Sequence, residues 1–411
     1  MLALGAALFS ITLAAVAHDV GHWGTPDLVI YRHAGLTAWH SGQLYTAAFG
    51  TGRFTYPPFA ALVFEALTLP LAATRWIMTG TSLAALAVAA WVSAGAAGLR
   101  SPARFPARFP AGFRAGVALV IAWAALWADP VMSTLTWGQV DLVLLAVVLA
   151  DLCLREDRWW QGAGLGLAAG IKLTPLIFIP FLLMTRRYRA ALVAIAAFGL
   201  TIIVSFAALP HEARGYWLGA LFLRQQRVGY PGALPDQSLD GMLARLSGSG
   251  QAAWYVWLAA VVIIGASGML LAALAHRRGL GLLAIVACAV TGLLISPISW
   301  DHHWVWIVPL PVAALAMIRE RGTTLGTACL VALAALFLDY PIFSGTQLGP
   351  RSALDGLIWG TGGDPRHWHG LQLVSGNLYV LAGLAILCAT ALVIAETPGD
   401  PPAGPRIPSH R

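Results

Sequence analysis

Long apolar runs, repeated from one end of the sequence to the other, are the feature that most restricts the fold of this chain. Between residues 2 and 394 they alternate with short polar segments. Charged residues make up only 10% of the 411 positions, whereas soluble domains carry about 25%. Because a bilayer-spanning helix needs about 20 apolar residues, these repeated runs predict an all-α polytopic membrane protein.

Arginines orient these runs, because the cytoplasmic loops of membrane proteins carry an excess of basic residues. If all the arginine clusters lie in the cytoplasm, the loops at 18–55, 211–251 and 341–373 lie outside. Residues 56–71 then lie along the outer interface, and both termini are inside. The clusters are Arg100, Arg104, Arg108 and Arg114; Arg155 and Arg158; Arg186, Arg187 and Arg189; Arg277 and Arg278; and Arg319 and Arg321.

The same orientation predicts a bundle of about twelve membrane-spanning helices. We expect one transmembrane domain over residues 1–395, with an external loop at 18–58 and a disordered cytoplasmic tail at 396–411. The first run lacks a basic segment before it, so we expect an uncleaved helix; because it is short, we expect the natural chain to begin upstream of Met1. The predicted spans are 2–17, 74–99, 113–128, 131–154, 160–172, 175–184, 190–209, 252–275, 280–295, 305–318, 324–338 and 374–394.

Neither the charge nor the cysteines indicate a nucleic-acid or metal-binding protein. The net charge of +7 is explained by the cytoplasmic arginines, so we expect membrane lipid and no nucleic acid as a partner. The four cysteines lie in or beside apolar runs without CxxC spacing, which predicts buried thiols and neither a disulfide framework nor a zinc site. They are Cys153, Cys288, Cys329 and Cys388.

The first external loop gathers polar side chains directly after the first apolar run. A polar cluster at the edge of the bilayer is costly unless it has a function, so Asp27 is a candidate catalytic carboxylate. The alternative is structural: Thr25 would cap a helix, Pro26 would take its first position, and Asp27 would complement the helix dipole. For the tyrosines, the alternative to sugar binding is anchoring at the interface. The candidate residues in this loop are Asp27, Tyr31, Arg32, Tyr45 and Tyr56.

A second cluster surrounds Lys172, the only lysine in the chain. The short apolar stretch before it carries small residues, Gly162, Gly164 and Gly166, which permit close helix packing. Basic residues at the far ends of the two flanking stretches, together with the helix breaker Pro175, predict that the chain turns round near Lys172. Lys172 would then lie at the floor of an outward-facing cavity and bind an anion. The alternatives are that it snorkels to water or caps helix carbonyls.

A third cluster, at 296–306, carries the adjacent histidines His302 and His303. Histidines that bind a metal on a helix are about four residues apart, and adjacent positions face different ways, so we expect no metal. An imidazole at an outer helix N-terminus suits a phosphate, and one of the two is a candidate for this role. Here the alternatives are that Asp301 caps the helix and that the nearby tryptophans form an interfacial belt.

Gln139 and Asp141 form a polar pair at the outer end of another predicted span. They are candidates either for substrate contact or for hydrogen bonding between helices.

Seven short motifs occur in order between residues 24 and 310. They are Asp27-Leu28-x-x-Tyr31, Gly42-x-Leu44-Tyr45, Tyr56-Pro57-Pro58-Phe59, Trp137-Gly138-Gln139, Ile171-Lys172-Leu173-Thr174-Pro175, Gln237-Ser238-Leu239 and Ile298-Ser299-Trp300-x-His302-His303. Together they resemble glycosyltransferase family 87 of the GT-C superfamily, the actinobacterial polyprenyl-phosphate-mannose-dependent mannosyltransferases. Asp141 departs from this pattern, in which we expect an asparagine.

The resemblance implies a GT-C-type bundle in the cell membrane with an outward-facing site, and it implies that Asp27 is the catalytic aspartate after the first helix. It also implies transfer of mannose from polyprenyl-phosphate-mannose to a mannosylated lipid or glycan acceptor, with an α-1,2 linkage. Asp27 would be the general base. Lys172, one of His302 and His303, and Arg32 would stabilise the phosphate. With one carboxylate and a phosphate leaving group, we expect inversion without a metal or cofactor.

Two other functions remain open at this point. A transporter or flippase of lipid-linked sugars would show internal repeats and ionisable groups near the bilayer midplane, whereas here no repeat is evident and the polar groups gather at outer helix ends. A ligase or polymerase that uses a polyprenyl-linked oligosaccharide would share the same broad architecture.

Overall fold

The computed structural model describes residues 2–40, 43–49, 52–97, 111–153, 158–224, 227–322, 324–338 and 364–397. Within these ranges the chain is helical and forms no β-strand, which confirms the all-α prediction. Several predictions fall outside them: the tail 398–411, the motif residue Gly42, and the arginines Arg100, Arg104, Arg108 and Arg155.

The described chain contains a few helices of 19 residues or more and many that are much shorter. The α-helices are α1 (Leu2–Val20), α2 (Pro26–Thr37), α3 (Pro58–Phe64), α4 (Leu71–Ala96), α5 (Ala111–Ala125), α6 (Asp129–Trp137), α7 (Asp141–Leu152), α8 (Ala163–Ile171), α9 (Phe178–Met184), α10 (Tyr188–Ala208), α11 (Pro210–Ala213), α12 (Leu239–Leu246), α13 (Trp254–Arg277), α14 (Gly281–Ile295), α15 (Pro309–Arg321), α16 (Leu325–Ala335), α18 (Leu371–Ser375) and α19 (Leu378–Glu396).

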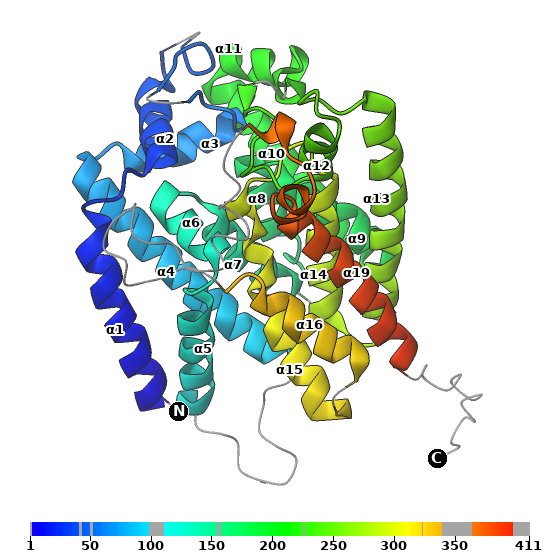
Figure 1. Ribbon diagram of the computed structural model, residues 1–411. Helices are drawn as coiled ribbons and strands as arrows, with labels where there is room; N and C mark the ends of the chain where they lie inside the picture. The colour runs from blue at the N-terminus through cyan, green and yellow to red at the C-terminus, as the bar shows by residue number, and fades with distance from the viewer. Residues whose placement is uncertain are drawn as a thin grey trace, which may run out of the picture.

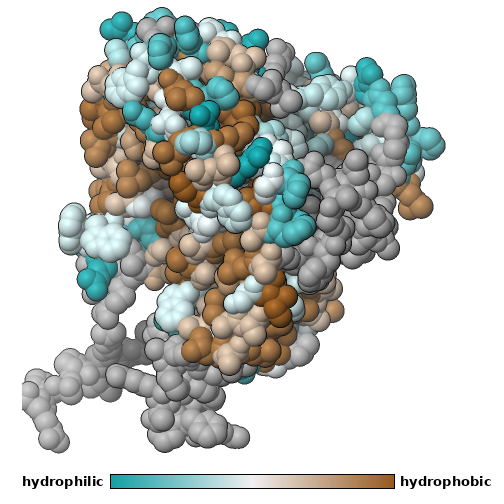
Figure 2. All heavy atoms as spheres, turned by 90° about the vertical axis from the view of Figure 1, so that its left-hand side faces the viewer, coloured by the Kyte–Doolittle hydropathy of each residue, from teal (hydrophilic) through white to brown (hydrophobic). Residues whose placement is uncertain are grey.

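Six described helical segments are long and apolar enough to cross a bilayer: α1, α4, α10, α13, Asp301–Glu320 and α19. In Figure 1, α1, α4, α13 and α19 run between the upper and lower sides of the molecule, and α2, α3 and α11 lie at the upper end. Figure 2 shows hydrophilic residues gathered at this upper end and hydrophobic residues over the flank below it. This distribution is that of a multi-pass membrane protein with polar elements at one end.

The chain reverses direction at Lys172, as the sequence predicted. A Cβ on Gly162 would collide with the Ala190 carbonyl, and one on Gly170 would meet Thr201, so α8 and α10 run side by side in the same direction. Since α9 leads into the start of α10 through only three residues, α9 must run opposite to α8. Of the small residues predicted there, Gly162 and Gly166 pack directly against α10, and Gly164 packs against α7.

The predicted single span 131–154 is wrong, because the structure divides it into α6 and α7. Gly138 ends α6 with a φ of 71°, a left-handed conformation that glycine adopts without strain. Its Cα also lies against α2, since an added Cβ would come within 2.6 Å of the Leu28 side chain. The end of α6 therefore packs directly against the first external loop.

Candidate active site

A cavity of about 1100 Å³ lies where several separate segments of the chain meet. Ligand sites are typically about 300–1,000 Å³, so this space exceeds that needed by one small ligand. The segments are the start of α2, residues 52–57, the break after α6, the Lys172 turn, the connection that contains Tyr216, Phe222 and residues 227–235, and residues 296–303. Seven of the predicted site residues line it: Asp27, Tyr31, Tyr56, Gln139, Lys172, His302 and His303.

Asp27 is held by Gln139, which belongs to the break between α6 and α7. The Gln139 Nε2 donates to the Asp27 Oδ2 at 2.5 Å. On its other side, the Gln139 Oε1 accepts hydrogen bonds from the hydroxyls of Tyr31 and Tyr56. Because both hydroxyls donate to the amide oxygen, the amide nitrogen is the atom that faces Asp27.

The capping alternative for this loop is only partly realised. Pro26 does begin α2, but Thr25 has a positive φ of 42° and makes no side-chain cap. Its Oγ1 instead accepts a hydrogen bond from Arg75 Nε at 3.1 Å. Thr25 therefore connects the loop to α4 and does not satisfy the free N–H groups of α2.

The pKa of Asp27 is raised above its ordinary value, chiefly because the carboxyl is buried. His302, the Gln139 hydrogen bond and Lys172 act in the opposite direction and favour the carboxylate. A carboxylate whose pKa lies closer to neutrality is a better proton acceptor than an ordinary aspartate. The environment of Asp27 thus suits a general base.

Lys172 forms a buried ion pair with Asp141. Its Nζ lies 2.6 Å from Asp141 Oδ1, and both side chains are more than nine-tenths buried. The same ammonium lies 5.4 Å from the centre of the Tyr56 ring, at cation–π distance. Asp141 therefore offsets the charge of Lys172, while the remaining N–H groups of the ammonium stay available to a ligand.

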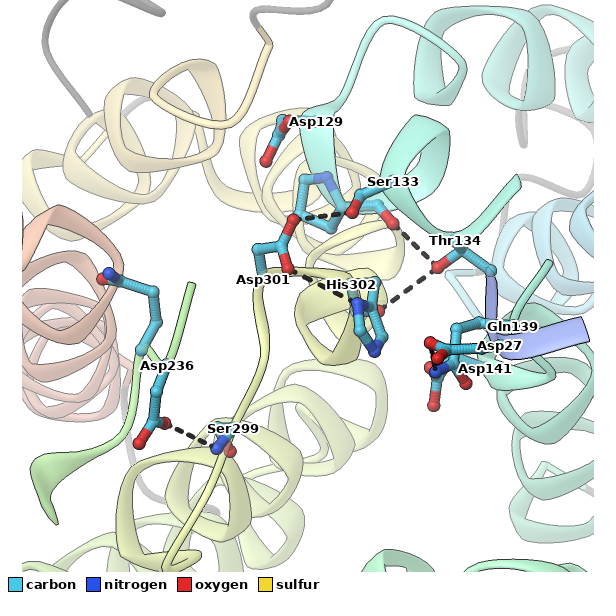
Figure 3. A network of polar contacts seen from close by, with 12 residues as sticks. Asp27, Asp129, Ser133, Thr134, Gln139, Asp141, Asp236, Ser299, Asp301 and His302 are labelled. Atoms are coloured by element: carbon cyan, nitrogen blue, oxygen red, sulfur yellow. Dashed lines mark hydrogen bonds and ion pairs between the residues drawn. The ribbon is translucent and has the colours of Figure 1, made fainter. Parts of the chain in front are cut away.

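His302 is positioned by α6 and by its own neighbour, Asp301 (Figure 3). Ser133 donates to Asp301 Oδ2 at 2.6 Å, and Asp301 Oδ1 lies 3.4 Å from His302 Nδ1. Thr134 also donates to the main-chain oxygen of His302 at 3.2 Å. Asp301 makes no helix cap, so its carboxylate orients the imidazole instead.

The two histidines come together, although adjacent helix positions were expected to diverge. Their ring centres are 4.8 Å apart, within the 3₁₀ helix Asp301–Ile307. One donor atom from each of Asp141, His302 and His303 lies within 4.8 Å of the others. This geometry could hold a metal ion, but the Lys172 ammonium already occupies one Asp141 oxygen and would repel a second cation.

Besides Asp141, which pairs with Lys172, two predicted residues lie outside the cavity lining. Tyr45 is buried beneath it, where its hydroxyl donates to the Tyr56 carbonyl at 2.8 Å and its ring stacks on Tyr216. Arg32 turns toward the start of α4, and its Nε donates to the Leu69 carbonyl at 2.6 Å. Tyr45 thus supports the Tyr56 segment, and Arg32 joins α2 to the following connection.

Sequence reasoning missed the residues that hold the histidine segment in place. Asp236 is fully buried and accepts a hydrogen bond from the Ser299 N–H at 2.9 Å (Figure 3). The main chains also pair, since Gln237 donates to Ser299 and Asp301 donates to Pro235. The motif at Gln237-Ser238-Leu239 marked this segment, but no local pattern connected it to a partner sixty residues away.

Comparison with known proteins assigns this chain to a family. Residues 54–297 match the family model described as glycosyltransferase family 87, which covers more than half of the chain. The matched region includes the break after α6, the Lys172 turn and the Asp236 segment.

Similar curated proteins cover most of the chain. One from Mycobacterium tuberculosis, 30% identical over 90% of this chain and 84% of its own length, is named a polyprenol-phosphate-mannose-dependent α-(1-2)-phosphatidylinositol mannoside mannosyltransferase. A relative of the same name from Mycolicibacterium smegmatis is 32% identical over 89% of this chain and 83% of its own length. A second protein from M. smegmatis, named for a phosphatidylinositol pentamannoside, is 35% identical over 66% of this chain and 64% of its own.

Proposed function

The chain belongs to glycosyltransferase family 87, and from this premise we propose that it transfers mannose from polyprenyl-phosphate-mannose to a phosphatidylinositol mannoside or similar mannosylated lipid. The donor and acceptor classes are those for which its relatives are named, as is the α-1,2 linkage. The observation that carries the proposal is the single cavity lined by Asp27, Lys172 and the two histidines.

Asp27 is the general base in this proposal. Its carboxylate takes the proton of the acceptor hydroxyl as that oxygen forms a bond to the anomeric carbon of mannose. The bond between this carbon and the phosphate oxygen breaks, and its electron pair leaves with the polyprenyl phosphate. Attack from the face opposite the phosphate inverts the anomeric centre, so a β-linked donor gives an α product. A positioned base typically contributes ~10²–10⁴-fold.

The departing phosphate is stabilised by N–H groups on the other side of the cavity. The Lys172 ammonium has donors beyond the one bonded to Asp141. The Nε2 of His302 and the Nδ1 of His303 are buried and make no hydrogen bond to the described residues, whereas the Nδ1 of His302 faces Asp301. Donors that are already oriented toward a developing charge lower the barrier without reorganisation. This route needs no metal ion.

We place the cavity at the outer face of the cell membrane, in a GT-C-type domain that spans residues 1–395. The six long helices and the shorter apolar helices, among them α14 and α16, together make up about twelve crossings in this proposal. The basic ends of α13 and α15 then lie in the cytoplasm. The polar upper end that contains α2 and α3 (Figure 1) faces outward.

The test is transfer of labelled mannose by the purified full chain. Polyprenyl-phosphate-[¹⁴C]mannose is supplied with phosphatidylinositol mannosides, and the product is digested with an α-1,2-specific mannosidase. We expect a labelled product that loses its label on digestion. A product that resists the enzyme would refute the linkage. Absence of transfer, together with translocation of the labelled lipid in proteoliposomes, would favour a flippase.

A further inference from the structure

Two arginines that line the cavity, Arg53 and Arg227, carry charges that its carboxylates do not offset. Lys172 is paired with Asp141, and Asp301 is engaged by Ser133 and His302. By contrast, within the described part of the chain, no carboxylate lies at ion-pair distance from Arg53 or Arg227. The cavity therefore has a second cationic group besides the one near Asp27.

Arg227 is fixed in place by the external loop that contains Arg53. Its Nη2 donates to the main-chain oxygen of Tyr45 at 2.5 Å and lies 3.5 Å from that of Phe54, the residue directly after Arg53. Arg227 is half-buried, while the Arg53 side chain is exposed and makes no hydrogen bond to the described residues. Burial, and then the neighbouring charge of Arg53, lower the pKa of Arg227.

Two like charges held close together without a counter-charge are unfavourable, and an anion between them would relieve the repulsion. The guanidinium group presents a planar fork of donors that matches phosphate oxygens, and such charge-assisted hydrogen bonds are stronger than neutral ones. A lipid phosphate is the anion that both substrates of the proposed reaction carry.

The surroundings of Asp27 indicate which phosphate, that of the donor or that of the acceptor, the two arginines bind. The donor phosphate is bonded to the reacting carbon and must lie beside Asp27, where the charges that act on the carboxyl are His302, Lys172 and Asp141. The acceptor phosphodiester is separated from the attacking hydroxyl by inositol and mannose residues, so it must lie further off. Arg53 and Arg227 line the same cavity, and neither is among the charges that act on the Asp27 carboxyl.

We infer that Arg53 and Arg227 bind a lipid phosphate, and that this group is the phosphodiester of the acceptor lipid. This inference rests on the proposed function, from which it takes the acceptor class. The cavity then holds two phosphates, and the length of glycan between the acceptor phosphodiester and Asp27 selects which mannose is extended.

The test compares two acceptors that differ in charge. One is a phosphatidylinositol mannoside, and the other is an alkyl mannoside with the same mannose chain and no phosphate. KM values for donor and acceptor are measured for wild type, Arg53→Gln and the charge-preserving Arg53→Lys. Arg214→Gln is the matched control, because it removes the same charge from an exposed position that does not line the cavity.

We expect Arg53→Gln to raise the KM for the phosphatidylinositol mannoside about tenfold, since one charge-assisted hydrogen bond is lost. The KM for the alkyl mannoside should change less than twofold, and Arg53→Lys should recover most of the loss. A raised donor KM with both acceptors would keep the lipid-phosphate site but overturn its assignment to the acceptor. Changes below twofold in every KM would overturn the site itself.

A binding measurement separates failure of this inference from failure of the proposed function. Wild type, Arg53→Gln and Arg227→Gln are placed in nanodiscs with phosphatidylinositol or diacylglycerol, and retained lipid is measured by native mass spectrometry. Preferential retention of phosphatidylinositol by wild type, reduced in both variants, supports the site even if no mannose is transferred. Equal retention by all three proteins would overturn it whatever the activity.

Discussion

At the scale of single residues, Gln139 connects the proposed base to the rest of the site. Its amide nitrogen bonds to Asp27 while its oxygen accepts from Tyr31 and Tyr56, so its orientation is fixed by both tyrosines. The hydrogen bond to Asp27 also lowers the pKa of a carboxyl that burial raises. Gln139 thus affects both the position and the protonation of Asp27.

Replacing Gln139 with alanine should move the acid limb of the pH–rate profile to higher pH. A base must be deprotonated to act, and loss of the hydrogen bond removes one of the influences that lower the pKa of Asp27. The measurement is kcat/KM for mannose transfer against pH. Tyr31→Phe, which leaves the amide in place, should shift the limb less. An unchanged limb in Gln139→Ala would contradict this account.

The burial of Asp236 leads us to expect that folding stability depends on pH, independently of catalysis. Burial raises its pKa from 3.8 to about 7, so the folded protein holds this proton more tightly than the unfolded chain. The stabilisation is fully present below pH 4 and is lost as pH rises toward 7. Asp236→Asn cannot lose a proton, and its oxygen can still accept from Ser299.

The difference in apparent melting temperature between Asp236→Asn and wild type should therefore grow in favour of the variant from pH 5 to pH 7. The comparison is made on purified protein in detergent. Because other groups titrate in both proteins, their effects cancel in the difference between the two melting temperatures. A constant difference over this range would show that Asp236 does not titrate there.

Much of the candidate site could be predicted from residue type and spacing, because Asp27, Gln139, Lys172 and the histidines each stood out in an apolar context. The sequence could not show which of these side chains contact one another. The pair between Lys172 and Asp141 depends on the reversal of the chain between α8 and α9. Arg32 could not be assigned either, since its guanidinium finds the Leu69 carbonyl only after α2 packs beside α4.

At the scale of elements, the break between α6 and α7 brings Gln139 to Asp27. Gly138 provides the left-handed residue that ends α6, and its missing side chain lets the break approach Leu28, the residue after Asp27. The polar stretch from Ser133 to Asp141 marked this position in the sequence, but it did not show whether the helix continues through it or ends. The reversal at Lys172 was predictable, since arginines and Pro175 marked both of its sides.

Gly138→Ala should impair both stability and activity. A left-handed alanine costs roughly 1–2 kcal/mol, and its Cβ would lie 2.6 Å from that of Leu28. The displaced break would separate Gln139 from Asp27, so kcat should fall more than thermal stability alone explains. The matched control is Gly80→Ala in α4, where an added Cβ meets nothing within 4 Å; it should preserve activity. Equal activity of the two variants would argue against the role of the break.

At the scale of the whole molecule, the fold class followed directly from the apolar runs, and the comparisons confirm the family that the motifs resembled. The number of membrane crossings could not be predicted from the apolar runs in the same way. Among the described residues, six helices have the length of a full span, whereas α8 and α9 are short segments on either side of a turn. Run length and hydropathy do not distinguish such segments from complete crossings.

Orientation in the membrane can be tested by cysteine labelling in intact cells. In a chain whose four native cysteines are replaced, Gln43→Cys lies in the first loop and Glu320→Cys lies at the end of α15; both native side chains are exposed. A membrane-impermeant maleimide should label position 43 in intact cells and position 320 only after permeabilisation. The opposite pattern would place the cavity in the cytoplasm.

The most direct test of the account is the rate of mannose transfer in a single turnover by wild type and Asp27→Asn, with donor binding measured in parallel. Asparagine keeps the shape of the side chain but cannot accept the proton. If Asp27 is the general base, the rate should fall at least ~10²-fold with donor affinity retained. Asp240→Asn, outside the cavity lining, should transfer mannose as wild type does. Equal rates for wild type and Asp27→Asn would contradict this role of Asp27.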